Sequence, residues 1–239
     1  MIDNLRAKPV RKGELKEDVF ELRPNTPKLI NKENNSHIAY LHEEKLNEGV
    51  DEHLYIHSIF HDEAYAIICN EFKLNLMDNA KTVDMSYYYF GTNNPVNVYL
   101  YDLKKTLSGI DVIYKLVLQW ESSIEDSEYC VKKITKCELK KENIYLGVIT
   151  ENNDINDRNN NLNDLFQKVE ISEEVPSSVQ SKQRRNIANY IIMAKRLKGF
   201  DEGKVTIDGV TYEYDVREFV NQKHDMYFED GQLKEDKAV

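Results

Sequence analysis

The sequence predicts a protein of the mixed α/β class, because segments with helical periodicity alternate with segments of strand composition along one chain. Residues 108–129 repeat apolar side chains at the i, i+3, i+4, i+7 spacing of a helix with one buried face. Residues 82–90 and 96–104 are rich in Tyr and Val, and Gly-Thr-Asn-Asn-Pro, a typical turn composition, separates them. These two runs predict a β-hairpin followed directly by a helix.

Residues 51–76 are predicted to form an earlier helix. On a helical wheel at 100° per residue, four apolar side chains gather within one face, namely Ile56, Ile59, Phe60 and Ile67. Residues 1–50 contain three of the five prolines and an Asn-rich patch, which predicts irregular structure with one or two short strands.

In the second half of the chain, residues 134–139 and 144–150 are predicted to be strands. Residues 152–163 are polar and low in complexity, and they predict an exposed loop. A helix is expected at residues 180–198 and a hairpin at 204–214, around Asp-Gly, with a charged and frayed tail from Glu229. The predicted organisation is an irregular segment at 1–50, a core at 51–150, a polar loop at 151–180, and a C-terminal helix, hairpin and tail packed on the core at 181–239.

Composition excludes several classes of protein. The chain has 239 residues and a mean hydropathy of -0.64, and it lacks an apolar run of the roughly 18 to 20 residues that cross a bilayer. Its first residues lack the apolar core of a signal peptide, so we expect a cytoplasmic protein with no membrane partner. Three cysteines without a CxxC pair argue against a disulfide framework or a structural zinc site.

The net charge of -10 argues against non-specific capture of nucleic acid by the chain as a whole. One stretch, residues 181–199, contains basic side chains and no acid. It is either a solvated helix face or a surface that contacts the nucleic-acid backbone. Its basic residues are Lys182, Arg184, Arg185, Lys195, Arg196 and Lys198.

The predicted hairpin carries the residues best suited to chemistry. Asp102 and Lys104 alternate on its second strand, so they project to the same side. A carboxylate there can hold a divalent cation, and the ammonium can orient a water that attacks phosphorus. Because Mg²⁺ prefers several oxygen ligands, a second carboxylate is needed. Asp84 lies near the start of the first strand, which antiparallel pairing brings close to Asp102.

Two further side chains are candidates for the same site. On the predicted helix at 51–76, Glu63 falls in the centre of the apolar face, where an acid needs a metal or a basic partner. Gln119 lies one turn beyond Leu116 on the inward side of the next helix, where its amide could hydrogen-bond a water or a phosphate.

This arrangement resembles the PD-(D/E)XK nuclease superfamily, in particular its RecB-like branch, over residues 53–150. The resemblance rests on Glu63, Asp84, Asp102-Leu103-Lys104 and Gln119, in that order. It implies a restriction-endonuclease-like fold, a central mixed β-sheet flanked by helices, and cleavage of a DNA or RNA phosphodiester with Mg²⁺ or Mn²⁺ held by the three acids. The sequence departs from the pattern where no Pro precedes Asp84 and where Trp120 follows the glutamine.

A non-catalytic explanation stays open for each of these residues. Asp102 and Lys104 could form a polar strand end, Asp84 could face solvent, and Glu63 could pair with a core tyrosine or lysine. The superfamily also contains members that keep the fold without the metal site. The protein would then be a binding or adaptor subunit, or a phage-encoded inhibitor.

Other side chains admit both a functional and a structural interpretation. His53, His57 and His61 repeat at i, i+4, i+8 on the predicted helix, so neighbouring pairs could share a metal ion or lie on the surface. Cys69 lacks a nucleophile-elbow glycine and is expected to be a core thiol. The tyrosines of the hairpin either pack under a helix or stack on unpaired bases.

The sequence therefore predicts a metal-dependent nuclease. Because a chain of this charge is a poor independent binder of DNA, we expect a protein partner such as a helicase, an ATPase or a second subunit, or a homo-oligomer. Small nucleases that this chain resembles are commonly components of bacterial defence against phage.

Overall fold

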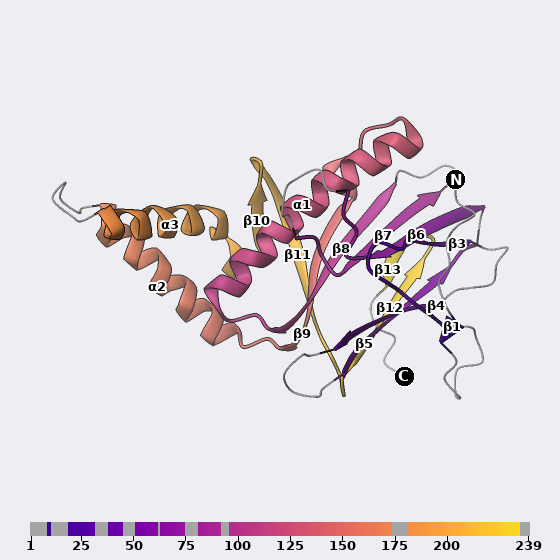
Figure 1. Cartoon of the computed structure of the whole chain (residues 1–239), viewed down its shortest axis with the longest axis horizontal. Coiled ribbons are helices and arrows are strands. Elements are labelled where there is room, and N and C mark those ends of the chain that lie inside the picture. The colour runs from indigo at the N-terminus through magenta and orange to yellow at the C-terminus, as the bar shows by residue number, and fades with distance from the viewer. Residues whose placement is uncertain are drawn as a thin grey trace.

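The computed structural model describes residues 9–10, 19–31, 38–44, 51–61, 63–74, 81–91, 96–173 and 181–234. Within these ranges, two mixed β-sheets and three α-helices form three layers (Figure 1). The larger sheet is the middle layer, with the helices on one face and the smaller sheet on the other. This confirms the predicted mixed α/β class.

The middle sheet has seven strands in the order β10-β11-β9-β8-β7-β6-β3. The pairs β3–β6, β6–β7, β7–β8 and β10–β11 are antiparallel, whereas β8–β9 and β9–β11 are parallel. The predicted hairpin is therefore confirmed as β7 and β8, and the predicted strand at 144–150 is confirmed as β9. The strands are β3 (Lys28–Asn31), β6 (Ala64–Asn70), β7 (Met85–Gly91), β8 (Asn97–Thr106), β9 (Ile144–Asn152), β10 (Lys204–Ile207) and β11 (Val210–Glu218).

The second sheet has six strands in the order β1-β2-β4-β5-β12-β13. Strand β12 of this sheet lies parallel to β5, with Lys223 opposite His53, so distant parts of the chain pair here. The strands are β1 (Pro9–Val10), β2 (Val19–Glu21), β4 (Ile38–Glu44), β5 (Asp51–Ile59), β12 (Lys223–Glu229) and β13 (Gln232–Lys234).

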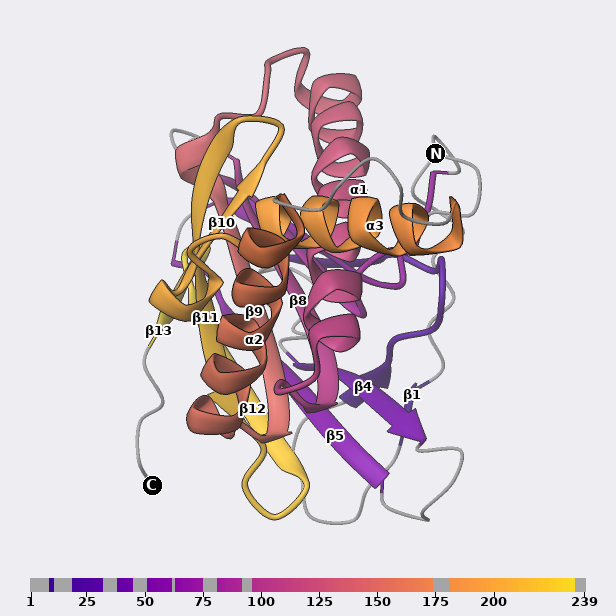
Figure 2. The ribbon, with the colours of Figure 1, turned by 90° about the vertical axis from the view of Figure 1, so that its left-hand side faces the viewer.

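The helices are α1 (Ile110–Thr135), α2 (Ile155–Glu173) and α3 (Ser181–Leu197), with 3-10 turns η1 (Lys141–Asn143) and η2 (Phe200–Glu202). α1 packs along the middle sheet, and α2 and α3 contact each other and α1 while running in different directions (Figure 2). The predicted helix after residue 108 and the predicted helix at 180–198 are both confirmed, as α1 and α3.

Strands β7 and β8 are buried on both faces. On β7, Tyr88 and Phe90 point toward the helices, where Trp120 of α1 is fully buried, whereas Tyr87 and Tyr89 point toward the second sheet. A middle layer of this kind reads as a nearly continuous apolar run, as the sequence of β7 does. The hairpin tyrosines pack in the two cores.

The predicted helix at 51–76 is wrong. The chain there forms β5 and β6 with a turn between them. Leu54 and Ile56 face the core while Tyr55 faces the other side of the sheet, so the strand period of two describes the burial better than the helical period does. Ile59, which the helical pattern placed inside, is 52% exposed.

The predicted polar loop at 152–163 is also wrong, because α2 occupies most of it. Leu162 and Leu165 are buried against the helix-side core in spite of the surrounding Asn and Asp residues. The carboxylate of Asp154 accepts a hydrogen bond of 2.9 Å from the backbone N–H of Asp157, which is N-cap geometry. The segment is therefore a capped helix with a narrow apolar stripe, although its composition is mostly polar.

Two smaller predictions also differ from the structure. The strand expected at 134–139 is absent from this described segment, because α1 continues to Thr135 and ends at Lys136 in a left-handed conformation. The tail expected to fray from Glu229 instead turns at Asp230-Gly231, both with positive φ, into β13. The hairpin around Asp208-Gly209 is confirmed as β10 and β11.

The N-terminal segment holds more strand than expected, since β1 to β4 all lie in its described parts. Among the described residues, no helix is both long and apolar enough to span a membrane.

Candidate functional site

Strand β8 places Asp102 and Lys104 under α1. Val98 and Leu100 of this strand pack in the core on the helix side, and the alternation of the strand carries Asp102 and Lys104 to the same face. The carboxylate of Asp102 is fully buried, the Lys104 side chain is 19% exposed, and the two form an ion pair. The same-side arrangement predicted from the sequence is therefore present.

Asp84 stands opposite Asp102 at the start of β7. Met85 pairs with Tyr101 in an antiparallel ladder, so Asp84, just before β7, faces Asp102 of β8. The backbone N–H of Asp84 donates to Asp102 Oδ1 at 3.3 Å, and Asp84 Oδ2 accepts from the backbone N–H of Leu103 at 2.7 Å. Asp84 is buried, which excludes the alternative that it faces solvent.

Gln119 of α1 joins these residues from above. Its Nε2 donates to Asp102 Oδ1 at 2.9 Å and to the carbonyl oxygen of Thr82 at 3.0 Å, and its Oε1 accepts from Lys104 Nζ at 3.1 Å. Only this orientation of the amide satisfies all three contacts, since the opposite one would set NH₂ against the ammonium. Asp84, Asp102, Lys104 and Gln119 therefore form one hydrogen-bonded network.

A polar stripe on α1 holds the chain that leads into β7. Ser123 Oγ accepts from the backbone N–H of Val83 at 3.0 Å, and Asp126 Oδ2 accepts from the backbone N–H of Leu74 at 3.2 Å. Burial raises the pKa of the Asp126 carboxyl above its ordinary value, and the hydrogen bond from Leu74 partly offsets this. The contact with Ser123 holds the segment that carries Thr82 and Asp84 beneath Gln119.

The structure does not bring Glu63 to this network. Glu63 is an exposed residue of the turn between β5 and β6, not a helix residue on an apolar face. Ala64 pairs with Gly91 at one end of β7, whereas Asp84 precedes the other end, seven residues from Gly91 and about 23 Å along the strand. The prediction for Glu63 depended on the helical assignment of residues 51–76, which is wrong.

The basic stretch predicted to contact nucleic acid lies on and just after α3. Lys195 and Lys198 are exposed, whereas Arg196 is partly buried and pairs with Glu121 of α1. Glu121 and Gln119 point about 160° apart around α1, so Arg196 lies on the other side of this helix from the network. Lys182, Arg184 and Arg185 belong to α3, but their side chains lie outside the described residues.

The three histidines are not on a helix. His53 and His57 share one face of β5, and His61 follows that strand. His57 Nε2 contacts Asp225 Oδ1 at 2.6 Å and its ring stacks on Tyr227, while His61 Nδ1 contacts Asp230 Oδ2 at 2.9 Å. The histidines therefore lie in separate contacts rather than around one point.

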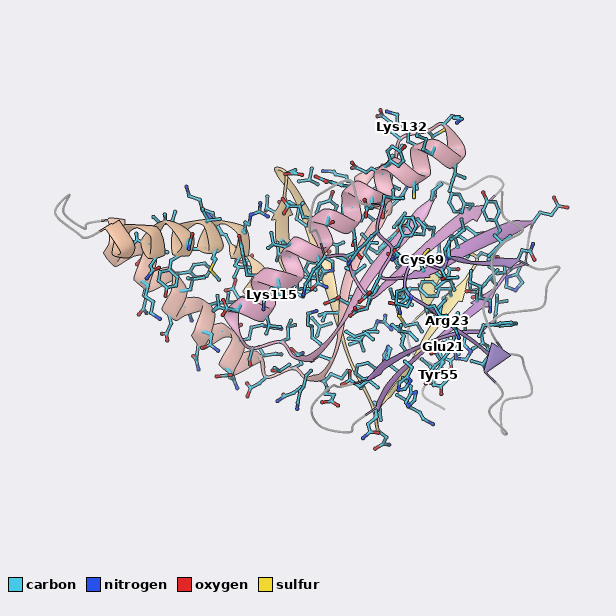
Figure 3. The ribbon with its side chains drawn as sticks, viewed as in Figure 1. Glu21, Arg23, Tyr55, Cys69, Lys115 and Lys132 are labelled. Atoms are coloured by element: carbon cyan, nitrogen blue, oxygen red, sulfur yellow. The ribbon has the colours of Figure 1, made fainter. Side chains whose placement is uncertain are left out.

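Cys69 is a core thiol of β6, as expected. It is buried, and burial raises the pKa of its thiol well above the ordinary value, which opposes a nucleophilic role. Figure 3 shows it among the strands of the middle sheet.

Sequence reasoning missed several contributors to the network. The carbonyl of Thr82 and the side chains of Ser123 and Asp126 belong to no sequence motif. The i, i+4, i+7 spacing of Gln119, Ser123 and Asp126 could nevertheless have indicated that these polar side chains share one face of the helix. Lys81 precedes Thr82, and Lys115 lies one helical turn before Gln119; both are exposed.

The carboxylates of Asp84 and Asp102 are the groups in this network that could hold a metal. Among the described residues, no three or more His, Cys, Asp or Glu side chains gather closely enough to form a metal site by themselves. Mg²⁺ commonly binds one or two protein carboxylates and takes its other ligands from water and substrate phosphate. Two hard oxygen donors on neighbouring strands fit that pattern.

Comparison with protein-family models, with curated proteins and with solved structures gives no match to this chain.

Proposed function

We propose that this protein is a metal-dependent nuclease that hydrolyses phosphodiester bonds of DNA or RNA. The observation that carries the proposal is the network in which Gln119 contacts both Asp102 and Lys104 while Asp84 faces Asp102 across the hairpin. A chance D-x-K on a strand would not be expected to meet a second acid and an inward amide. We further propose a PD-(D/E)XK-like core made of β6, β7, β8, α1 and β9.

In this proposal Asp84 and Asp102 would hold Mg²⁺ or Mn²⁺. The bound cation would offset negative charge on the phosphate and lower the pKa of a coordinated water. The chain itself pairs the carboxylate of Asp102 with Lys104 and fixes it with the amide of Gln119. Preorganised groups of this kind stabilise developing charge because they need little reorganisation during the reaction.

Lys104 is the only member of the ion pair that reaches solvent, since its side chain is 19% exposed and Asp102 is fully buried. Its ammonium carries three donors, of which the contacts to Asp102 and Gln119 use two. The third is available for a water or a phosphate oxygen. Lys104 would therefore orient the nucleophile, and Gln119 would hold Lys104 in place.

The partner and the cellular role are parts of the same proposal. The net charge of -10 disfavours unaided capture of a polyanion, so we propose that a helicase, an ATPase or another subunit delivers the strand. Lys195 and Lys198 of the α3 region are exposed and would add backbone contacts away from the network. A role in bacterial defence against phage follows from the resemblance alone.

The test is cleavage of end-labelled DNA and RNA, single- and double-stranded, in Mg²⁺ or Mn²⁺. The native chain is compared with Asp102→Asn and Lys104→Gln, which preserve side-chain size, and with Lys132→Gln, an exposed lysine at the far end of α1. Loss of cleavage in the first two alone, with unchanged circular dichroism, would support the proposal. Cleavage that survives both variants would place the chemistry elsewhere.

A second candidate is a non-catalytic binding or adaptor subunit, or an inhibitor, built on the same scaffold. It is favoured by the complete burial of Asp102 and by the distance of Glu63 from the network. A network whose acids are satisfied by the protein can serve stability alone. Absence of metal-dependent cleavage by the native chain, with its partners present, would favour this candidate.

A further inference from the structure

Two exposed lysines flank the amide of Gln119. Lys115 precedes it by four residues on α1, about 40° around the helix, so the two side chains share one face. Lys81 precedes Thr82, whose carbonyl oxygen accepts the hydrogen bond from Gln119 Nε2. Lys104 contacts the same amide from β8. Lys104 therefore contacts the amide directly, and Lys81 and Lys115 lie on the two segments that border it.

The charges near these lysines leave Lys81 and Lys115 able to bind an anion. Within the described residues, neither lysine makes an ion pair, whereas Asp102 is paired with Lys104. The nearest acid along α1 is Asp111, one turn before Lys115 and exposed. Asp84, Asp102 and Asp111 match the three lysines in number, but Asp84 and Asp102 are buried, so Lys81 and Lys115 outnumber the one exposed carboxylate of this set.

We propose that Lys81 and Lys115 bind the backbone phosphates on either side of the phosphate held at Lys104, and that the bound strand is single-stranded. This inference rests on the proposed function of the same network. It identifies two substrate-positioning residues and the form of the substrate.

The burial of the network decides between single strand and duplex. Asp102 is fully buried under α1, and only part of the Lys104 side chain reaches solvent. A duplex is stiff, with a persistence length of about 50 nm, so it cannot bring one phosphate to a side chain that is mostly buried beneath a helix without being distorted. A single strand bends freely at each nucleotide and follows a positively charged groove.

The experiment measures binding, independently of cleavage. Fluorescence anisotropy follows a labelled 20-nucleotide DNA, the same sequence as RNA, and the DNA duplex, in EDTA and at several salt concentrations. The native chain is compared with Lys81→Ala/Lys115→Ala and with the control Lys132→Ala/Lys141→Ala, which removes the same charge. Lys132 lies 17 residues from Lys115 on α1, about 25 Å away, and Figure 3 shows the two at opposite ends of the helix.

We expect the Lys81→Ala/Lys115→Ala variant to bind the single strands about tenfold more weakly than the native chain. The slope of log K against log salt should fall by about 1.4, because each lost phosphate contact accounts for about 0.7 on a single strand. The control should keep the native affinity and slope, and the native chain should bind single strands more tightly than the duplex. Circular dichroism checks that each variant is folded.

Equal affinity of the two double variants, no binding by the native chain, or preference for the duplex would overturn the inference. Failure of the proposed function has a different signature. If Lys81 and Lys115 determine binding while the native chain cleaves none of the strands in Mg²⁺ or Mn²⁺, the network binds single strands without cutting them.

Discussion

The carboxylate of Asp84 accepts a 2.7 Å hydrogen bond from the backbone N–H of Leu103. The acid therefore has a structural task, because it satisfies a buried donor of β8 where the ladder with β7 begins. A substitution of Asp84 that removes both the negative charge and the acceptor oxygen would affect the proposed metal site and the stability of the fold together. Two variants are needed to separate these effects.

Asp84→Ala should lower the free energy of unfolding by about 1–3 kcal/mol, because the N–H of Leu103 is left buried without an acceptor. Asp84→Asn keeps an oxygen at the same place and should recover most of that loss. Urea unfolding of the two variants measures the difference. If the proposed function holds, Asp84→Asn should nevertheless lose cleavage; equal stability of Ala and Asn would show that the hydrogen bond contributes little.

Gly147 of β9 lies directly under the ring of Tyr101. A Cβ at this position would stand 2.1 Å from the tyrosine ring, which is too close for any side chain. Gly147→Ala should therefore lower the free energy of unfolding by about 1–3 kcal/mol or more. Gly109→Ala is the matched control, since its Cβ would meet only ordinary contact at 3.6 Å.

The double variant Gly147→Ala/Tyr101→Leu tests the cause. It should be more stable than the sum of the two single changes predicts, because the smaller side chain relieves the clash. Simple additivity, measured by thermal or urea unfolding, would mean that the two residues do not interact as the structure indicates.

Asp126 gives a pH-dependent prediction. Burial raises the pKa of its carboxyl in the folded chain above the ordinary value of 3.8, so the folded state binds a proton more readily than the unfolded state. Stability from this group is therefore greatest below that value and falls as the pH rises through the folded pKa. Asp126→Asn removes the charge and keeps an acceptor for Leu74.

We expect Asp126→Asn to have a higher urea midpoint than the native chain at pH 7. At pH 3 the two midpoints should be the same, because the Asp126 carboxyl is then protonated in both the folded and the unfolded native chain. A difference that is constant with pH would assign the effect to packing. Asp164 is an exposed acid of α2, and Asp164→Asn is the control. Its urea midpoint should not differ from that of the native chain in a pH-dependent way.

The three cysteines should differ in reactivity toward a thiol reagent at pH 8. Cys137 is exposed and should react quickly, whereas burial raises the pKa of the Cys130 thiol to about 11 and that of Cys69 further still. Cys69 should react only after unfolding in urea. A fast reaction that disappears in Cys69→Ser would contradict its placement in the core.

The parts of the site that could be predicted are those with short-range signals. The hairpin, the following helix and the facing of Asp84 and Asp102 all follow from local periodicity, a turn and antiparallel pairing. Gln119 was predictable because the apolar stripe of α1 defines its inward side.

Glu63 could not be placed, because the fold of its segment depends on distant partners. β5 lies between β4 and β12, and residues near the C-terminus supply one of its two neighbours. Tertiary pairing therefore overrides a local pattern that also fits a helix. α2 was missed for another reason, since its apolar stripe is narrow and its Asn-rich surface resembles a loop.

The position of β12 between β5 and β13 also has a consequence for synthesis on the ribosome. β12 begins 164 residues after β5 ends, so β5 leaves the ribosome long before the strand that pairs with it. Until then β5 presents an open hydrogen-bonding edge, and Tyr87 of β7 lacks the Phe228 ring of β12 that stacks on it in the folded protein. Such an edge is prone to pair with other chains, so the nascent protein should depend on chaperones until β12 is translated.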